Sequence, residues 1–255
     1  MLRDRIIFSL IHNKGAFMQS RNFRLQKVGD INWLEKNYQL KNISFSLDEL
    51  TVVDATKDSK CLDDFARTVS RLVDDVFIPV AAGGGISKIS DAELLFNSGA
   101  DKIIVNTSLH ANPDLIAQIV ARFGSQSIVA SVDYKVENGK PVIYIENGTK
   151  SLDLSLDNYI SLLHELNVGE VYLNSMDRDG TGFGYDLEVI KSYSHLFDMP
   201  LIVSGGAGNG QHMKEALSIE GVTAVATANL FNFVGDGLPK ARNLLIGSGA
   251  NLAKW

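Results

Sequence analysis

Two short glycine runs in the sequence could bind anions. One is Gly83 to Gly85, and the other is Gly205 and Gly206 with Gly208. Glycine lets backbone N–H groups approach an anion without an intervening Cβ, and a nearby helix N-terminus adds a favourable dipole. Tight turns are the alternative explanation for either run taken alone. The pattern predicts two phosphate-binding sites, with the members Gly84, Gly85, Asn106, Thr107, Gly205, Gly206, Ala228 and Asn229.

Three acidic residues at the ends of predicted strands could exchange protons with a substrate. They are Asp54, Asp133 and Asp179. A carboxylate in such a place can act as a general acid or base when its surroundings tune its pKa. The alternative role is a loop cap or an ion pair with Arg178. Asp133 is the strongest candidate, because it ends an otherwise apolar strand.

Eight short apolar strands alternating with amphipathic segments must position these residues. The predicted strands are Arg5–Ile11, Glu49–Asp54, Ile78–Gly83, Lys102–Asn106, Ser127–Asp133, Glu170–Asn174, Leu201–Ser204 and Thr223–Thr227. Helical patterns between them include Cys61–Asp74, Asp91–Asn97, Pro113–Arg122 and Leu154–Leu166. Eight βα units in 255 residues predict an α/β protein with one (β/α)8 TIM barrel, whose catalytic face lies at the carboxyl ends of its strands. A doubly wound open sheet is the alternative.

The chain also repeats itself at an offset of 122 residues. Segment 82–105 aligns with 204–227, and segment 5–11 aligns with 127–133. The repeat predicts two half-barrels, about 1–122 and 123–245, within a single domain over 1–255. It also makes Ile11 the equivalent of Asp133, so only one half offers a carboxylate there. Two equivalent glycine runs predict a substrate that carries a phosphate at each end.

Composition excludes several classes of function. The formal net charge of −6 argues against nonspecific nucleic-acid binding, which needs a basic surface. The single cysteine, Cys61, allows neither an internal disulfide nor a cysteine metal cluster, and we expect no metal or cofactor. No apolar run approaches the ~18 residues of a membrane span, and the first residues are unlike a signal peptide. We therefore expect a cytoplasmic protein with no membrane partner.

Seven stretches of the chain resemble the cyclase subunit of imidazole glycerol phosphate synthase, the HisF family. They run from Arg5 to about Phe233 and are RIIFSL, VAAGGGI, GADKIIVNTSLHANP, FGSQSIVASVDYK, NSMDRDGTGFGYD, SGGAG and NLFNF. The segment DRDGTGFGYD and the glycine runs are specific to this family and its isomerase relatives in histidine biosynthesis. The resemblance implies a barrel that receives ammonia from a glutaminase through its axis. Two aspartates, ending the first and fifth strands, then act on a bisphosphorylated ribulosyl substrate.

The resemblance also assigns roles to positions of this chain and shows where the chain departs from the family. Asp133 matches the fifth-strand aspartate, Ile11 replaces the first-strand aspartate, and Gln19 replaces a lysine of the loop that closes on substrate. Asn174 stands where threonine is usual, and the substrate-mouth positions are Asp54, Asn174 and Asp179. The positions of the ammonia gate are Arg5, Glu49, Lys102 and Glu170, and a glutaminase contact falls on Asp101. A salt-bridged plug that only stabilises the barrel is the alternative for the four charges.

A complete ammonia entrance combined with an incomplete acid–base pair favours a divergent relative. It would dock a glutaminase and conduct ammonia, but serve a different acceptor. Resemblance to cyclase-like proteins of bacterial surface-polysaccharide pathways implies amidination of a sugar, together with a separate sugar amidotransferase. The alternative is an authentic cyclase of histidine biosynthesis, although strand alternation points the neighbouring His12 out of the barrel. Sugar-phosphate isomerisation is a third possibility, and Ile11 counts against it equally.

Overall fold

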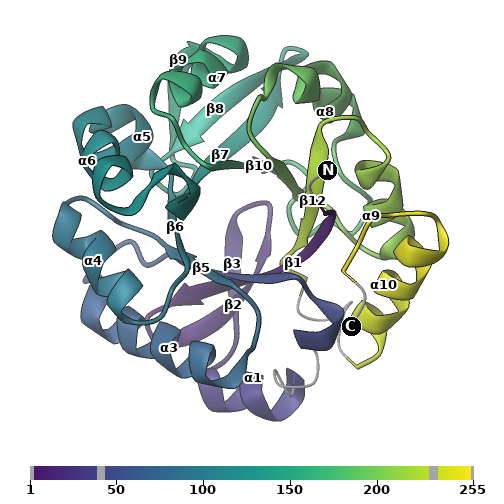
Figure 1. Cartoon of the computed structure of the whole chain (residues 1–255), viewed down its shortest axis with the longest axis horizontal. Helices are drawn as coiled ribbons and strands as arrows, with labels where there is room; N and C mark the ends of the chain where they lie inside the picture. The colour runs from purple at the N-terminus through teal and green to yellow at the C-terminus, as the bar shows by residue number, and fades with distance from the viewer. Residues whose placement is uncertain (1–2, 39–43, 230–234, 254–255) are drawn as a thin grey trace.

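The computed structural model describes residues 3–38, 44–229 and 235–253, and eight parallel strands close into a barrel (Figure 1). The barrel strands are β1 (Arg5–Asn13), β4 (Glu49–Asp54), β5 (Val80–Gly83), β6 (Lys102–Val105), β7 (Ile128–Glu137), β10 (Glu170–Ser175), β11 (Leu201–Ser204) and β12 (Val222–Thr227). Each strand pairs in parallel with the next, and β12 pairs with β1. Pairing between β7 and β10 completes the ring, so the open-sheet alternative is wrong. The predicted (β/α)8 barrel is confirmed.

Helices cover the outside of the barrel (Figure 1). The α-helices are α1 (Ile31–Tyr38), α3 (Leu62–Asp75), α4 (Ile89–Asn97), α5 (Thr107–Ala111), α6 (Pro113–Phe123), α7 (Leu156–Glu165), α8 (Leu187–Tyr193), α9 (Gly210–Leu217) and α10 (Gly237–Gly247). Short 3₁₀ turns are η1 (Ser44–Ser46), η2 (Ser125–Ser127) and η3 (Ser194–Leu196). Helix α6 begins as its sequence predicts, because Asn112 caps the Leu115 N–H and proline occupies the first turn. Within the described ranges, no helix is long and apolar enough to cross a membrane.

Strand alternation separates two apolar regions. On β1, Ile6, Phe8 and Leu10 belong to the large core between the strands and the helices, whereas Ile7 points into the barrel lumen. The lumen is filled mainly by Ile7, Ala81, Ile104, Val129, Tyr172, Ile202, Ala224 and Ala226. Side chains that continue this inward face toward the carboxyl ends of the strands therefore reach the mouth of the barrel.

Two antiparallel hairpins extend the barrel wall and were not among the predicted strands. Strands β2 (Ala16–Arg21) and β3 (Arg24–Gly29) follow β1, and β8 (Lys140–Ile145) and β9 (Lys150–Ser155) follow β7. Each hairpin follows the first strand of one predicted half-barrel. The turn of the second hairpin is Asn138-Gly139, and both residues have positive φ. An Asn-Gly pair between apolar runs is the strongest short sequence signal for a hairpin. That signal could have revealed the second hairpin.

Candidate functional site

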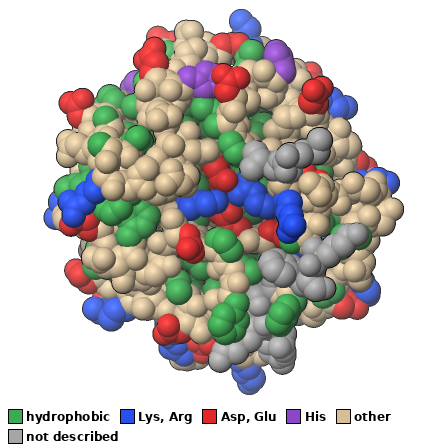
Figure 2. Space-filling model, viewed as in Figure 1, with side chains coloured by type: hydrophobic (Ala, Val, Ile, Leu, Met, Phe, Trp, Pro, Cys, Tyr) green, Lys and Arg blue, Asp and Glu red, His purple; other side chains and the backbone are tan. Residues whose placement is uncertain are grey.

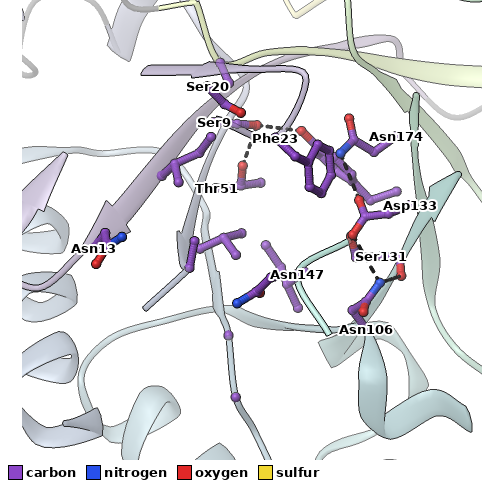
Figure 3. A pocket seen from close by; sticks show the side chains of 18 of the residues that line it. Ser9, Asn13, Ser20, Phe23, Thr51, Asn106, Ser131, Asp133, Asn147 and Asn174 are labelled. Carbon is purple, nitrogen blue, oxygen red and sulfur yellow. Dashed lines mark hydrogen bonds between the residues drawn. The ribbon is translucent and has the colours of Figure 1, made fainter. Parts of the chain in front are cut away.

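A cavity of about 660 Å³ opens at the carboxyl ends of the barrel strands. The predicted site residues that line it are Ile11, Gly84, Gly85, Asn106, Thr107, Asp133, Asn174, Asp179 and Ala228. Figure 3 shows Asn106, Asp133 and Asn174 along one wall, with Asn13 on the opposite side. The hairpins add Ser20, Phe23 and Asn147 to the lining, which sequence reasoning missed because it missed the hairpins.

Asp133 is held by two amides at the inner wall of the cavity. Its Oδ1 accepts a hydrogen bond from Asn174 Nδ2 at 2.8 Å, and its Oδ2 accepts one from Asn106 Nδ2 at 3.3 Å. The pKa of Asp133 is raised to about 7, mainly because the carboxyl group is buried. The hydrogen bond from Asn174 lowers this pKa, and the negative charge of Asp179 raises it. A carboxyl group with a pKa near neutrality can both donate and accept a proton at physiological pH.

The opposite strand offers no matching group. Ile11 lines the cavity, and the other lining residues from β1 are Ser9, Leu10 and Asn13, none of which titrates near neutral pH. His12 instead lies buried in the barrel wall, where its Nδ1 is 3.1 Å from Asp54 Oδ1. It therefore cannot replace the missing aspartate.

Asp54 does not lie in the mouth as the sequence predicted, because its partners draw it into the wall. It accepts hydrogen bonds from the Thr56 hydroxyl at 2.7 Å and from the Thr56 N–H. Desolvation pushes the pKa of Asp54 upward, but the bonds from His12 and Thr56 and the charge of Lys60 together lower it. Lys60 also donates to the Asp54 carbonyl at 2.9 Å. Asp54 therefore organises the loop beside the first glycine run.

Asp179 fastens the β2–β3 hairpin to the loop that follows β10. Its Oδ2 accepts hydrogen bonds from Ser20 Oγ at 2.5 Å and from the Phe23 N–H at 2.9 Å. Its carbonyl accepts the Asn22 N–H at 2.9 Å. Burial raises the pKa of Asp179 in spite of these bonds. The carboxyl group lines the cavity, yet it is already engaged in holding the hairpin.

Both glycine loops have the backbone that only glycine adopts easily. The φ angles are +114° at Gly84 and +93° at Gly205. A Cβ at Gly84 would lie 2.3 Å from the Asp54 carbonyl oxygen, and one at Gly205 would lie 2.4 Å from the Ser175 carbonyl oxygen. The first loop lines the large cavity, and Gly205, Gly206 and Asn229 line an adjoining space that shares Asp179, Ser204 and Ala228 with it. Close packing and positive φ explain the glycines in both loops.

A closed ring of alternating charges lies at the opposite end of the barrel; we call it the charged ring. Arg5 Nη1 is 3.0 Å from Glu49 and 2.8 Å from Glu170. Lys102 Nζ is 3.0 Å from Glu49 and 3.1 Å from Glu170. Figure 2 shows basic and acidic side chains together at the centre of this face. Desolvation raises the pKa of Glu49, whose Oε1 has no hydrogen-bond partner among the described residues.

Other residues at the amino ends of the strands surround the charged ring. Phe45 in η1 and Phe77 before β5 are 66% and 87% exposed. Asp101 is exposed, and its Oδ2 accepts the Val80 N–H at 2.8 Å. This face therefore combines a charged centre with exposed aromatic side chains.

Hydroxyl groups connect across the lumen between the charged ring and the mouth. Thr51 Oγ1 donates to Ser9 Oγ at 2.7 Å, and Ser9 Oγ lies 2.8 Å from the Tyr172 hydroxyl. The Tyr172 hydroxyl is also 2.8 Å from Ser204 Oγ. All four residues line the floor of the cavity. Polar hydroxyls thus interrupt the otherwise apolar filling of the barrel.

Comparison with known proteins agrees with this architecture. The model of the histidine biosynthesis protein family matches residues 18–235. Over its full length the chain is 41% identical to the hisF2 protein of Parasynechococcus marenigrum, covering 95% of that protein; its assignment as an imidazole glycerol phosphate synthase subunit is provisional. The chain is 37% identical to the imidazole glycerol phosphate synthase subunit HisF of Pyrobaculum aerophilum, over 86% of this chain and 85% of that protein.

The HisF subunit of Streptococcus sanguinis is 36% identical, over 91% of this chain and 92% of that protein. The resemblance found in the sequence motifs is therefore confirmed, although Leu230 to Phe233 of the NLFNF motif lie outside the described residues. The chain belongs to the histidine biosynthesis protein family and is a HisF-like member of it, similar to the HisF subunits of imidazole glycerol phosphate synthase.

Proposed function

We propose that this chain takes ammonia from a glutaminase partner and delivers it through the barrel axis to an acceptor bound at the mouth. The acceptor reaction is the amidination of a sugar in surface-polysaccharide biosynthesis, assisted by a separate sugar amidotransferase. One contrast carries the proposal. The charged ring has all four expected members in contact, whereas Ile11 leaves Asp133 without a catalytic partner from β1.

The charged ring can admit a small neutral molecule if one of its members moves. Lys102 holds its two carboxylates only through the tip of a flexible side chain, and its side chain is 18% exposed. Rotation of that side chain opens one side of the ring, while Arg5 still neutralises Glu49 and Glu170. A buried carboxylate that loses its partners is costly, so opening is expected to need a partner bound over the ring.

The exposed aromatic side chains beside the charged ring support a docking site for the glutaminase. Aromatic residues surrounded by polar groups are typical of the energetic centre of protein interfaces. Phe77, which is 87% exposed, is the clearest example. We propose that Phe77 and Asp101 contact the glutaminase.

The docking proposal is tested by measuring the affinity of a purified glutaminase subunit for variants of this chain. Phe77→Ala is expected to weaken binding about tenfold, as hot-spot aromatics do. Phe183→Ala is the matched control, because Phe183 is 77% exposed in the loop after β10, at the other end of the barrel. Equal affinities for both variants would contradict docking at the charged face.

An authentic cyclase of histidine biosynthesis is the second candidate function. It is favoured by the pKa of Asp133, which suits acid–base catalysis, and by the names of the HisF relatives. The test supplies the purified chain with the bisphosphorylated ribulosyl substrate and excess ammonium at alkaline pH. Turnover of about 1 s⁻¹ or more, an ordinary enzyme rate, would refute the divergent function.

Ile11→Asp sharpens this test, because it restores a carboxyl group that faces the cavity from β1. Under the divergent proposal, the native chain shows no turnover but still binds the glutaminase. A gain of cyclase activity in Ile11→Asp alone would show that the loss of this one residue separates the chain from the cyclases.

A further inference from the structure

Tyr172 lies halfway along the barrel axis, between the charged ring and the mouth. The inward-facing residues of β10 are, in order, Glu170, Tyr172 and Asn174. Glu170 belongs to the charged ring, and Asn174 donates a hydrogen bond to Asp133 at the mouth. Tyr172 is the largest side chain of the apolar lumen cluster, and it lines the floor of the cavity. A molecule that travels along the axis from one end to the other must therefore pass Tyr172.

The Tyr172 side chain is fastened to the far side of the barrel. Its hydroxyl donates to Ser204 Oγ on β11 and pairs with Ser9 Oγ on β1, both at 2.8 Å. Ser9 in turn accepts a hydrogen bond from Thr51 on β4 at 2.7 Å (Figure 3). In the closed ring of strands, β4 is four steps from β10 and so stands opposite it. The aromatic ring and this chain of hydroxyl groups together cross the lumen from wall to wall.

The open volume beside Tyr172 lies on the mouth side. Toward the charged ring, the lumen is filled by side chains such as Ile7 and Val129, which are fully buried. Strand β12 contributes Ala224 and Ala226 to the lumen, and these small side chains leave room for the aromatic ring in its closed position. Burial raises the pKa of Tyr172 to about 12, so its hydroxyl is neutral at physiological pH. The side chain can thus leave its place by swinging into the cavity once its two hydrogen bonds break.

We propose that Tyr172 is an inner gate that closes the barrel axis between the charged ring and the mouth. Ammonia reaches the mouth when the Tyr172 hydroxyl leaves Ser9 and Ser204 and the aromatic ring swings into the cavity. This inference rests on the proposed function in naming ammonia as the molecule that passes. The barrier itself belongs to this chain, and it is tested without a glutaminase or an acceptor, so its failure is separate from failure of ammonia delivery.

A cysteine placed on the charged-ring side of Tyr172 measures the barrier. Val129 is fully buried and pairs with Glu170. The next inward residue of the same strand, Ser131, pairs with Tyr172 and lines the cavity. Val129→Cys is made in a Cys61→Ser background, because Cys61 is the single native cysteine and is exposed. Mass spectrometry follows the rate at which methyl methanethiosulfonate, a small neutral thiol reagent, modifies the full chain.

Two substitutions of Tyr172 are expected to speed this modification. Tyr172→Phe keeps the aromatic ring but loses two hydrogen bonds, and it should raise the rate at Val129→Cys about tenfold. Tyr172→Ala removes the barrier, and it should raise the rate on the order of a hundredfold. Val53→Cys, which lines the cavity, should react rapidly in every background. Modification of Val129→Cys as fast as Val53→Cys while Tyr172 is intact would overturn the inference, and so would an unchanged rate in Tyr172→Ala.

Val52→Cys is the control that separates local opening from unfolding. Val52 is fully buried in the large core between the strands and the helices, so a cysteine there reacts when the chain unfolds. In both Tyr172 variants its rate should rise much less than the rate at Val129→Cys. An equal rise at the two cysteines would mean that Tyr172 only holds the fold together, and the gate would be refuted.

Discussion

Replacing Asp133 by asparagine is expected to change how stability depends on pH. The folded-state pKa of Asp133 is about 7, above its ordinary value of 3.8, because burial disfavours the ionised form. The folded state therefore holds the proton more strongly than the unfolded state. The contribution of Asp133 to stability is fully present below about pH 3.8 and is lost as the pH rises through 7.

The size of the effect follows from the two pKa values. At 1.36 kcal/mol per pH unit, ionisation destabilises the fold by about 1.7 kcal/mol at pH 5 and about 4.3 kcal/mol at pH 8. The native chain should thus lose about 2.6 kcal/mol more than Asp133→Asn between these pH values. Water in the cavity screens the charge of Asp133, and in the variant the new amide faces the Asn106 amide. The change in the free energy of unfolding between pH 5 and pH 8 is therefore expected to differ between the two proteins by about 1–2.5 kcal/mol.

Urea unfolding of both proteins at pH 5 and pH 8 measures this difference directly. Ionisable groups away from Asp133 contribute equally to both proteins and cancel in the comparison, and the exception is Asp179, whose charge acts on Asp133. If the free energies of unfolding of the two proteins change in parallel between pH 5 and pH 8, Asp133 does not have a raised pKa. Its assignment as the proton-transfer group of the mouth would then lose its physical basis.

Two further substitutions test how the barrel holds its parts. Arg242→Ala should lower the free energy of unfolding by about 2–4 kcal/mol, because it removes the two bonds of 2.9 and 3.0 Å from Arg242 to the Asp48 carboxylate, which keeps the bond of 2.8 Å from the Ile6 N–H. A loss below about 1 kcal/mol in urea unfolding would contradict this. Gly180→Ala should destabilise the chain by roughly 1–3 kcal/mol, because φ is +66° and the new Cβ would strike Ser20. It should also speed amide hydrogen exchange in 20–24, and unchanged exchange would show that the hairpin is not held at that contact.

The sequence by itself determined the architecture of this protein. Short apolar strands and amphipathic segments alternate eight times, and that local pattern favours a closed barrel over an open parallel sheet. The resemblance to the HisF family also named Arg5, Glu49, Lys102 and Glu170 as members of the charged ring. Each starts a predicted strand, and parallel strands start at the same end of a barrel. The absence of a carboxylate at Ile11 was likewise visible from the repeat.

Only the tertiary structure decided which of the predicted mouth residues face the cavity. Asp54 and Asp133 both end predicted strands, yet His12 and Lys60 draw Asp54 into the wall, while Asp133 stays at the cavity. The two glycine loops match in sequence, but the β2–β3 hairpin lies beside the second of them. That placement depends on contacts between residues about 160 positions apart, such as Ser20 with Asp179. Local pattern carries no information about such pairs, because they meet only when the barrel closes.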